Sequence, residues 1–258
     1  MPTTNYWNQN APAWTALTRA GYDVYRDQLN TPNFLAILPE IAGLRGLDIG
    51  CGEGHNTRLL AGQGAQMAAI DVAEIFIQNA QQTEREQPLG IEYQVADAAA
   101  LPYADTSFDY ATSFMCMMDV PDVASAFSEA FRVLRPGGFF QFSITHPCFD
   151  TPHRRNLRDA EGRTYAIEVG DYFKNLKGEL EEWIFGAAPA AEKARWPKFV
   201  VPRYTFTISQ WLNMLLETGF ILDYFQEPRP SDATVEQYPS LQDAQVVSYF
   251  LHIRCKKN

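Results

Sequence analysis

Short apolar runs alternate with amphipathic segments from residue 45 onward. Apolar runs of strand length are found at residues 45–49, 65–71, 90–95, 108–114 and 139–145. Segments with helical spacing of apolar residues separate them, at 57–62, 74–86 and 123–134. Pro136, Gly137 and Gly138 should end the last helix, because proline stops a helix and glycine permits a reversal. Alternating strands and helices indicate a mostly parallel sheet with helices on both faces.

The alternation is interrupted after the fifth strand and then resumes. Residues 147–204 form a connection that is longer than usual and rich in aromatic side chains, so we expect an ordered lid rather than a linker. Thr207 and Gln210 have the spacing of a capping box. The elements expected after them are a helix at 211–218 and strands at 220–226 and 246–255. These two strands lie close enough in sequence to pair antiparallel through the loop between them.

Together the elements predict one α/β domain over residues 1–258. Its core is expected to be a doubly wound, Rossmann-like sheet of seven strands, mostly parallel, with an antiparallel C-terminal strand. The predicted parts are a helical cover (1–44), a ligand-binding core (45–146), a lid insertion (147–204) and a C-terminal part that completes the sheet (205–258). Within the cover we expect two short helices with a break at 30–33.

The most informative chemical signal is a glycine-rich turn directly after the first strand. Asp48 ends this strand, and Gly50, Gly52 and Gly54 follow it before a helical segment. A strand, a glycine-rich loop and a helix start form the ligand-binding corner of a doubly wound sheet, because glycine lets the backbone approach the ligand closely.

The charge of this loop distinguishes between two kinds of ligand. A dinucleotide loop needs glycine at its first, third and sixth positions, and the sixth position here is His55. Asp48 and Glu53 offer carboxylates, which would repel a pyrophosphate and favour a cation. S-adenosylmethionine carries a sulfonium and an ammonium and has no phosphate. The loop resembles the first motif of the class I S-adenosylmethionine-dependent methyltransferases, acid-x-Gly-x-Gly-x-Gly, and a dinucleotide oxidoreductase is disfavoured.

Downstream spacing strengthens this resemblance. In the family an acid after the second strand accepts hydrogen bonds from the ribose hydroxyls, and Asp71 has that position. A further acid after the third strand lies near the adenine amino group, and Asp97 matches it. The segments 108–113 and 132–138 complete a pattern that covers about residues 45–145. The resemblance, which extends to small-molecule enzymes of the ubiquinone and menaquinone biosynthesis type, implies S-adenosylmethionine as methyl donor and S-adenosylhomocysteine as product.

The resemblance also implies a set of cofactor-binding residues. They are Asp48, Gly50, Cys51, Gly52, Asp71, Val72, Asp97, Ala98 and Met115, joined by Tyr25 from the N-terminal cover. Simpler roles stay open: Asp71 could cap the next helix, Asp97 could close an Asx turn, and Val72 and Met115 could belong to the core. Arg26 is an alternative to Tyr25 for contact with the carboxylate of the cofactor.

Methyl transfer depends mainly on holding the acceptor in line with the methyl group, and a base is needed only if the acceptor must lose a proton. Our candidate catalytic residue is His146, because the family often contacts the acceptor from the end of the fifth strand and histidine titrates near neutral pH. The alternatives for His146 are a structural role in a turn and metal binding together with Cys148. Of these we do not expect metal binding. Asp119 is a second candidate, whose simpler role is to cap the next helix.

Composition and charge limit the classes of molecule that could accept the methyl group. The chain has 258 residues, 46% of them hydrophobic, and a formal net charge of -10, which disfavours binding to nucleic acid. The basic run formed by His153, Arg154, Arg155 and Arg158 could meet an anionic acceptor and keeps RNA or protein methylation open, although a solvated loop is the default explanation. The aromatic lid favours a small apolar or aromatic acceptor. A third reading is a protein of this fold that binds the cofactor without catalysis.

Cysteine spacing and hydropathy indicate where in the cell the protein is found. Cys51, Cys116, Cys148 and Cys255 are far apart in sequence, which is typical of reduced thiols. Residues 1–10 are polar, and no apolar run approaches the roughly 20 residues of a membrane span. We therefore expect a cytoplasmic protein without a membrane span. No feature of the sequence indicates an oligomeric state.

Overall fold

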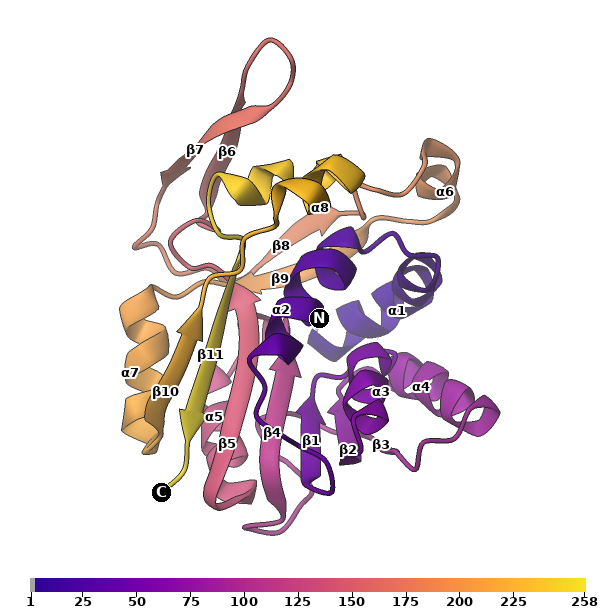
Figure 1. Ribbon diagram of the computed structural model, residues 1–258, viewed down its shortest axis with the longest axis vertical. Coiled ribbons are helices and arrows are strands. Elements are labelled where there is room, and N and C mark those ends of the chain that lie inside the picture. The colour runs from indigo at the N-terminus through magenta and orange to yellow at the C-terminus, as the bar shows by residue number, and fades with distance from the viewer. Residues whose placement is uncertain (1–2) are drawn as a thin grey trace.

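A seven-stranded sheet forms the centre of the molecule (Figure 1). The computed structural model describes residues 3–258. The strands lie in the order β10-β11-β5-β4-β1-β2-β3, and β11 is antiparallel to both neighbours while the other pairs are parallel. Their bounds are β1 (Arg45–Ile49), β2 (Gln66–Asp71), β3 (Glu92–Val95), β4 (Phe108–Phe114), β5 (Leu134–Thr145), β10 (Ile221–Gln226) and β11 (Phe250–Lys256). The predicted fold class is confirmed, including the antiparallel C-terminal strand.

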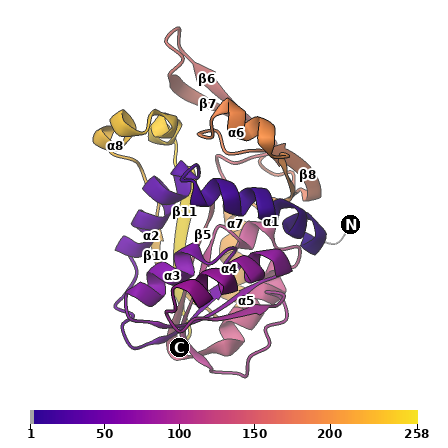
Figure 2. The same cartoon turned by 90° about the vertical axis from the view of Figure 1, so that its right-hand side faces the viewer.

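Helices cover both faces of this sheet (Figures 1 and 2). One face is covered by α5 (Val123–Val133) and α7 (Ile208–Thr218). The other face is covered by α2 (Thr31–Ala36), α3 (His55–Gly62) and α4 (Glu74–Glu86). The predicted capping box at the start of α7 is present, because Thr207 accepts the Gln210 amide and the Gln210 side chain accepts the Thr207 amide.

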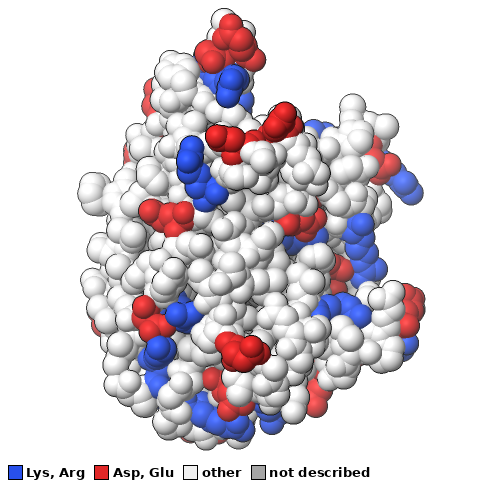
Figure 3. Space-filling view, viewed as in Figure 1, with Lys and Arg blue, Asp and Glu red and all other residues white. Residues whose placement is uncertain are grey.

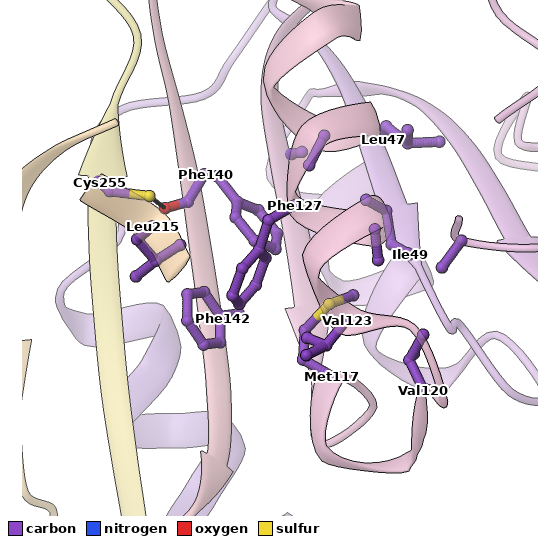
Figure 4. Close-up of a cluster of buried hydrophobic side chains, with 14 of the residues drawn as sticks. Leu47, Ile49, Met117, Val120, Val123, Phe127, Phe140, Phe142, Leu215 and Cys255 are labelled. Carbon is purple, nitrogen blue, oxygen red and sulfur yellow. Dashed lines mark hydrogen bonds between the residues drawn. The ribbon is translucent and has the colours of Figure 1, made fainter. Parts of the chain in front are cut away.

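The larger core lies between the sheet and the pair α5 and α7. Figure 4 shows aromatic side chains from α5 and β5 meeting there, with a leucine from α7 beside them. Phe127, Phe140, Phe142 and Leu215 are each 0% exposed. Strand residues alternate between the two faces, so Leu47 and Ile49 of β1 face this core. Asp48, between them, points to the opposite face, where it meets α3.

The insertion, residues 147–204, is ordered and lies above the carboxyl ends of the parallel strands (Figure 2). It contains two antiparallel hairpins and a short helix. They are β6 (His153–Arg158) with β7 (Thr164–Gly170), β8 (Lys177–Trp183) with β9 (Phe199–Tyr204), and α6 (Ala190–Arg195). The expectation of an ordered segment is therefore confirmed.

Most buried aromatic residues of the insertion pack against the N-terminal helix α1 (Thr3–Arg19). The ring of Trp14 in α1 lies 5.3 Å from Trp183, 5.1 Å from Phe185 and 4.7 Å from Phe199. Trp14 thus has the packing role that amphipathic helices ordinarily give such a residue. These aromatic side chains fasten the insertion to α1 and are not available to line a ligand site.

The predicted break at 30–33 in the N-terminal cover is wrong. A π-helix, η1 (Arg26–Asn30), continues directly into α2, and Pro32 lies in the first turn of α2, a position where proline is common. The chain turns instead after α1, at Gly21, whose φ is 81°. Met1 at the start of the cover lies outside the described residues, as does Pro2.

The segment between β10 and β11 also differs from the expected loop. It contains α8 (Asp232–Gln237), which Ser231 caps, and the 3-10 helix η3 (Pro239–Gln245). Buried Leu241 and Ala244 of η3 pack against Leu29 of η1, so this segment forms part of the cover over the sheet edge. Across residues 3–258 we find no helix with the length and apolar character that crossing a membrane requires.

Gly46 in β1 offers a test of this packing. A β-carbon at Gly46 would lie 2.3 Å from Cζ of Tyr110, a side chain that is 0% exposed. We predict that Gly46→Ala lowers the free energy of unfolding by about 1–3 kcal/mol, because an overpacked core must shift. Gly62→Ala is the matched control, since no atom lies within 4 Å of that β-carbon. Urea unfolding that gives equal stabilities for the two variants would contradict this account of the sheet.

Candidate active site

Four neighbouring strands bring the predicted ligand-binding segments together at one edge of the sheet. Strands β3, β2, β1 and β4 are consecutive in the sheet order, so the loops after their carboxyl ends lie side by side. These strand ends and loops carry all of the predicted cofactor-binding residues except Tyr25. Direct contacts join the loops to one another, as the following residues show.

The glycine-rich loop after β1 has a conformation that requires glycine. Gly50, Gly52 and Gly54 have φ angles of 75°, 55° and 88°. A β-carbon at Gly50 would lie 2.1 Å from Sγ of Cys116, in the segment after β4, whereas no atom lies within 4 Å of one at Gly52. The backbone amides of Gly50 and Cys51 both donate to the Ile70 carbonyl of β2. The loop is therefore fixed against β2 and β4 and leaves free space at Gly52.

Asp71 joins three of the four loops. Its Oδ2 accepts the Gly52 amide at 2.8 Å, its Oδ1 accepts the Ala73 amide at 2.8 Å, and its carbonyl accepts the Ala96 amide at 3.0 Å. The bond to Ala73 is a local contact at the start of α4, where the sequence left a helix-capping role open for Asp71. The bond to Gly52 is an additional contact, which joins Asp71 to the glycine loop. Each carboxylate oxygen keeps a lone pair for a ligand hydroxyl. Burial raises the pKa of Asp71 and outweighs the lowering effect of the backbone amides, so that the pKa is about 6.

The loop after β3 contains the Asx turn that was considered for Asp97. Oδ1 of Asp97 accepts the Ala99 amide at 2.9 Å. Within residues 3–258, Oδ2 of Asp97 makes no hydrogen bond and the Ala98 amide has no acceptor outside regular helices and strands. The turn thus fixes the position of an exposed carboxylate and still leaves a free acceptor and a free donor at the edge of the sheet.

Met115, directly after β4, has a strained backbone. Its φ is 53°, which is uncommon for a residue other than glycine and is often found at functional sites. The Met115 amide donates to the carbonyl of Ser143 at 3.0 Å and lies 3.2 Å from its hydroxyl, so β5 holds this conformation. The side chain packs beside buried residues of η1 and η3. Val72, on the neighbouring loop, is partly exposed.

The expectation that the glycine loop presents two free carboxylates is wrong. Asp48 is 1% exposed and accepts hydrogen bonds from the hydroxyls of Thr57 at 2.6 Å and Thr112 at 3.0 Å. Glu53 pairs with Arg19 of α1 at 2.9 Å and lies 3.9 Å from Arg26. Both carboxylates are satisfied within the protein, so they hold the loop to α3, β4 and the cover and do not determine the charge that a ligand meets.

Tyr25 does not point to the glycine loop. Its hydroxyl donates to the Ser240 carbonyl at 2.9 Å and its ring lies 5.0 Å from that of Tyr249, so Tyr25 joins η1 to the segment before β11. Arg26, the alternative, pairs with Asp27 at 2.7 Å and approaches the loop through Glu53. The sequence analysis did not identify Arg19 as a partner of the glycine loop. The feature that could have indicated it is a basic residue in the last turn of α1.

His146 has both ring nitrogens engaged. Its Nδ1 accepts the Cys148 amide at 3.2 Å, so Nε2 carries the hydrogen and donates to Oε1 of Glu227 at 2.7 Å. The side chain is 3% exposed, and the His146 carbonyl accepts the amides of Phe149 and Asp150. This geometry corresponds to the structural role in a turn that the sequence left open.

A hollow lies between the insertion and the ends of β4 and β5. It holds about 350 Å³ of empty space, part of it open to solvent. Its walls come from the 3-10 helix η2 (Met117–Asp119), the end of β5, the strand β9 and the start of α7. The lining residues are Met118, Asp119, Thr145, Pro147, Asp150, Arg203, Tyr204, Thr205, Phe206 and Trp211.

Asp119 lines this hollow. The sequence had suggested that it caps the next helix, but it does not. The cap of α5 is Asp122, which accepts the Ser125 amide at 3.1 Å. Burial raises the pKa of the Asp119 carboxyl to about 8, although the Arg203 guanidinium lowers it. A carboxyl with such a pKa, in a hollow at the edge of the sheet, is a candidate for contact with an acceptor.

The basic run lies on β6, in a hairpin and not in a loop, and its charges are largely compensated. Arg158 pairs with Asp243 at 3.0 Å, and Glu168 of β7 lies 2.9 Å from His153 and 3.8 Å from Arg155. Arg154 stacks on the ring of Tyr249 at 4.4 Å. Figure 3 shows acidic and basic side chains interspersed on one face of the molecule, without a continuous basic area.

The buried Asp48 carboxyl predicts a dependence of stability on pH. Burial raises its pKa from 3.8 to about 6, against the lowering effect of the two threonine hydroxyls. Folding therefore gains from this carboxyl below pH 3.8, and the gain is lost as the pH rises through 6. Asp48→Asn lacks this titration, so its stability relative to the wild type should rise by up to about 3 kcal/mol between pH 4 and 7. A pH-independent difference in urea unfolding would show that Asp48 titrates normally.

Comparisons with known proteins agree with this geometry. A family model described as a methyltransferase domain matches residues 47–142. A malonyl-[acyl-carrier protein] O-methyltransferase from Pectobacterium atrosepticum is 33% identical over 146 residues, which are 55% of this chain and 56% of that protein. A ubiquinone biosynthesis O-methyltransferase from Pseudomonas fluorescens is 35% identical over 137 residues, 53% of this chain and 54% of that protein. The matches span about a third to just over half of the curated relatives' length.

Similarity to a solved structure covers nearly the whole chain. The crystal structure of an S-adenosylmethionine dependent methyltransferase from Mesorhizobium loti is 29% identical, with a TM-score of 0.71, and the match covers 88% of this chain and 96% of that one. The family model, the fold and the glycine loop lead to one conclusion. Residues 47–142 match a methyltransferase domain, and the chain as a whole has the fold of an S-adenosylmethionine-dependent methyltransferase.

Proposed function

We propose that this protein binds S-adenosylmethionine at the joined loops and transfers its methyl group to a small molecule in the hollow. The observation that carries the proposal is the contact between Asp71 and Gly52, which places a carboxylate with free lone pairs beside the open face of the glycine loop. The bound cofactor would supply a methyl group that its sulfonium already activates. The protein then has to position the two reactants and exclude water.

The residues present fit this cofactor. Asp71 has two remaining acceptor sites for a pair of ribose hydroxyls, and Gly52 leaves space above the loop. Oδ2 of Asp97 and the Ala98 amide offer an acceptor and a donor for the edge of an adenine. Arg26 approaches the loop through Glu53, but it would have to leave Asp27 to bind the carboxylate of the cofactor, and Tyr25 is bound elsewhere. Asp48 and Cys51 support the loop from beneath.

We propose that the acceptor is a small molecule with an apolar or aromatic part. Support comes from Phe206 and Trp211 in the wall of the hollow, which can face an apolar part of the acceptor. Only a few aromatic residues face it, since Trp183, Phe185 and Phe199 pack on α1. RNA as substrate finds little support, because the basic side chains of β6 are paired with acidic neighbours.

We propose further that residues 1–258 work as one unit in the cytoplasm. All four cysteines are free thiols, which suits a reducing compartment. The cover, the insertion and the C-terminal part each contact the sheet edge or one another, so removing any of them would expose the proposed site.

Cofactor binding can be tested at Asp71. We predict that Asp71→Asn lowers the affinity for S-adenosylhomocysteine by about 10- to 100-fold, because one acceptor and the charge are lost. The matched control is Asp109→Asn, whose carboxylate accepts the Arg45 amide at the opposite edge of the sheet. Calorimetric titration should show the control unchanged. Equal affinities for the wild type and Asp71→Asn would remove Asp71 from the binding site.

Transfer can be tested without knowing the acceptor. The protein is incubated with S-adenosylmethionine carrying a labelled methyl group and with fractionated cell extract, and label is counted in the metabolite, RNA and protein fractions. We predict label in the metabolite fraction, strongly reduced with Asp71→Asn. Label only in RNA or protein would contradict a small-molecule acceptor. Tight cofactor binding with no labelled fraction would identify a protein that binds the cofactor without catalysis.

A further inference from the structure

Arg203 of β9 brings a guanidinium into the hollow, but its charge is already compensated. Its Nη2 pairs with Oδ2 of Asp150 at 2.7 Å, and its Nη1 lies 3.1 Å from Oε2 of Glu181 in β8. One positive charge thus meets two carboxylates. An anionic ligand would have to displace one of them, so Arg203 is poorly suited to bind a carboxylate or a phosphate.

Asp119 faces the same hollow and has no compensating partner. Among the hydrogen bonds and ion pairs of residues 3–258, none involves its carboxylate, although the side chain is largely covered by the insertion. Asp150 lies near enough to raise its pKa further, against the lowering effect of Arg203. Burial therefore favours the protonated carboxyl, and a bound ammonium group would favour its ionised form.

Aromatic rings form the wall around this carboxylate. Tyr204, Phe206 and Trp211 line the hollow, and the rings of Phe206 and Trp211 lie 5.4 Å apart, edge to face. Aromatic faces attract ammonium groups through the ring quadrupole. Arg154 lines a second hollow, which shares Thr145 and Asp150 with the first, and it is stacked on Tyr249.

We propose that the hollow is a binding site for the amine end of the methyl acceptor, with Asp119 opposite the ammonium group and the aromatic residues around the apolar body. This inference rests on the proposed function and specifies the chemical class of its acceptor. An ammonium group would form a charge-assisted hydrogen bond with ionised Asp119, whereas a carboxylate end would be repelled by that ionised form and an alcohol would gain only a neutral hydrogen bond. The site therefore selects a primary or secondary amine over an acid or alcohol of the same shape.

Three probes with the same aromatic body test this selection. The affinities of 2-phenylethylamine, 2-phenylethanol and phenylacetate are measured by calorimetry with the full chain saturated with S-adenosylhomocysteine. We expect the amine to bind at least about tenfold more tightly than the alcohol, and the acid most weakly. Asp119→Asn should reduce the amine to the affinity of the alcohol. Glu182→Gln removes an exposed charge on β8 that does not line the hollow, and it should leave the amine affinity within about twofold.

The outcomes separate this inference from the proposed function. If S-adenosylhomocysteine binds but the amine binds no better than the alcohol, or none of the probes binds, the amine site is wrong and the proposed function stands. Equal losses in Asp119→Asn and Glu182→Gln would also overturn it, because they would indicate a general attraction to negative charge. Failure of the unmodified protein to bind S-adenosylhomocysteine would overturn both. Thermal unfolding and S-adenosylhomocysteine affinity confirm that each variant is folded.

Discussion

The hydrogen bond from the Gly52 amide to the Asp71 carboxylate connects the first two strand ends of the sheet edge, and the other loops depend on it. Asp71 is 8% exposed, so its carboxylate is stable there only because backbone amides satisfy it. The same residue binds the third loop through its carbonyl, and Gly50 meets Cys116 after β4. Because the loops at this edge are already ordered, little conformational entropy is lost when a ligand binds.

Local sequence patterns were sufficient to predict the core of the fold. The bounds of β1, α4 and β4 agree with the apolar periods, because strand and helix repeats are set by neighbouring residues. The capping box at Thr207 and the terminal glycine of α7 also follow from local chemistry. Pro32 misled the prediction, since a proline can begin a helix as well as interrupt one, and the outcome depends on how η1 and α2 pack.

The roles of single side chains depended on partners far away in the sequence. Tyr25 was assigned to the ligand, but its acceptor is the Ser240 carbonyl, which no local pattern places nearby. The charge of the glycine loop was misjudged for the same reason, because Glu53 is paired with Arg19 of α1. Asp119 and Arg203 come from the core and the insertion, and only the folded chain brings them to one hollow.

A crystal structure of the protein with S-adenosylhomocysteine tests the central claim most directly. The account predicts that both ribose hydroxyls lie within hydrogen-bond distance of the Asp71 carboxylate while the bond to the Gly52 amide is kept. It also predicts that the sulfur faces the hollow between η2 and β9. A ligand bound elsewhere, or one at the edge of the sheet without contact to Asp71, would contradict the account.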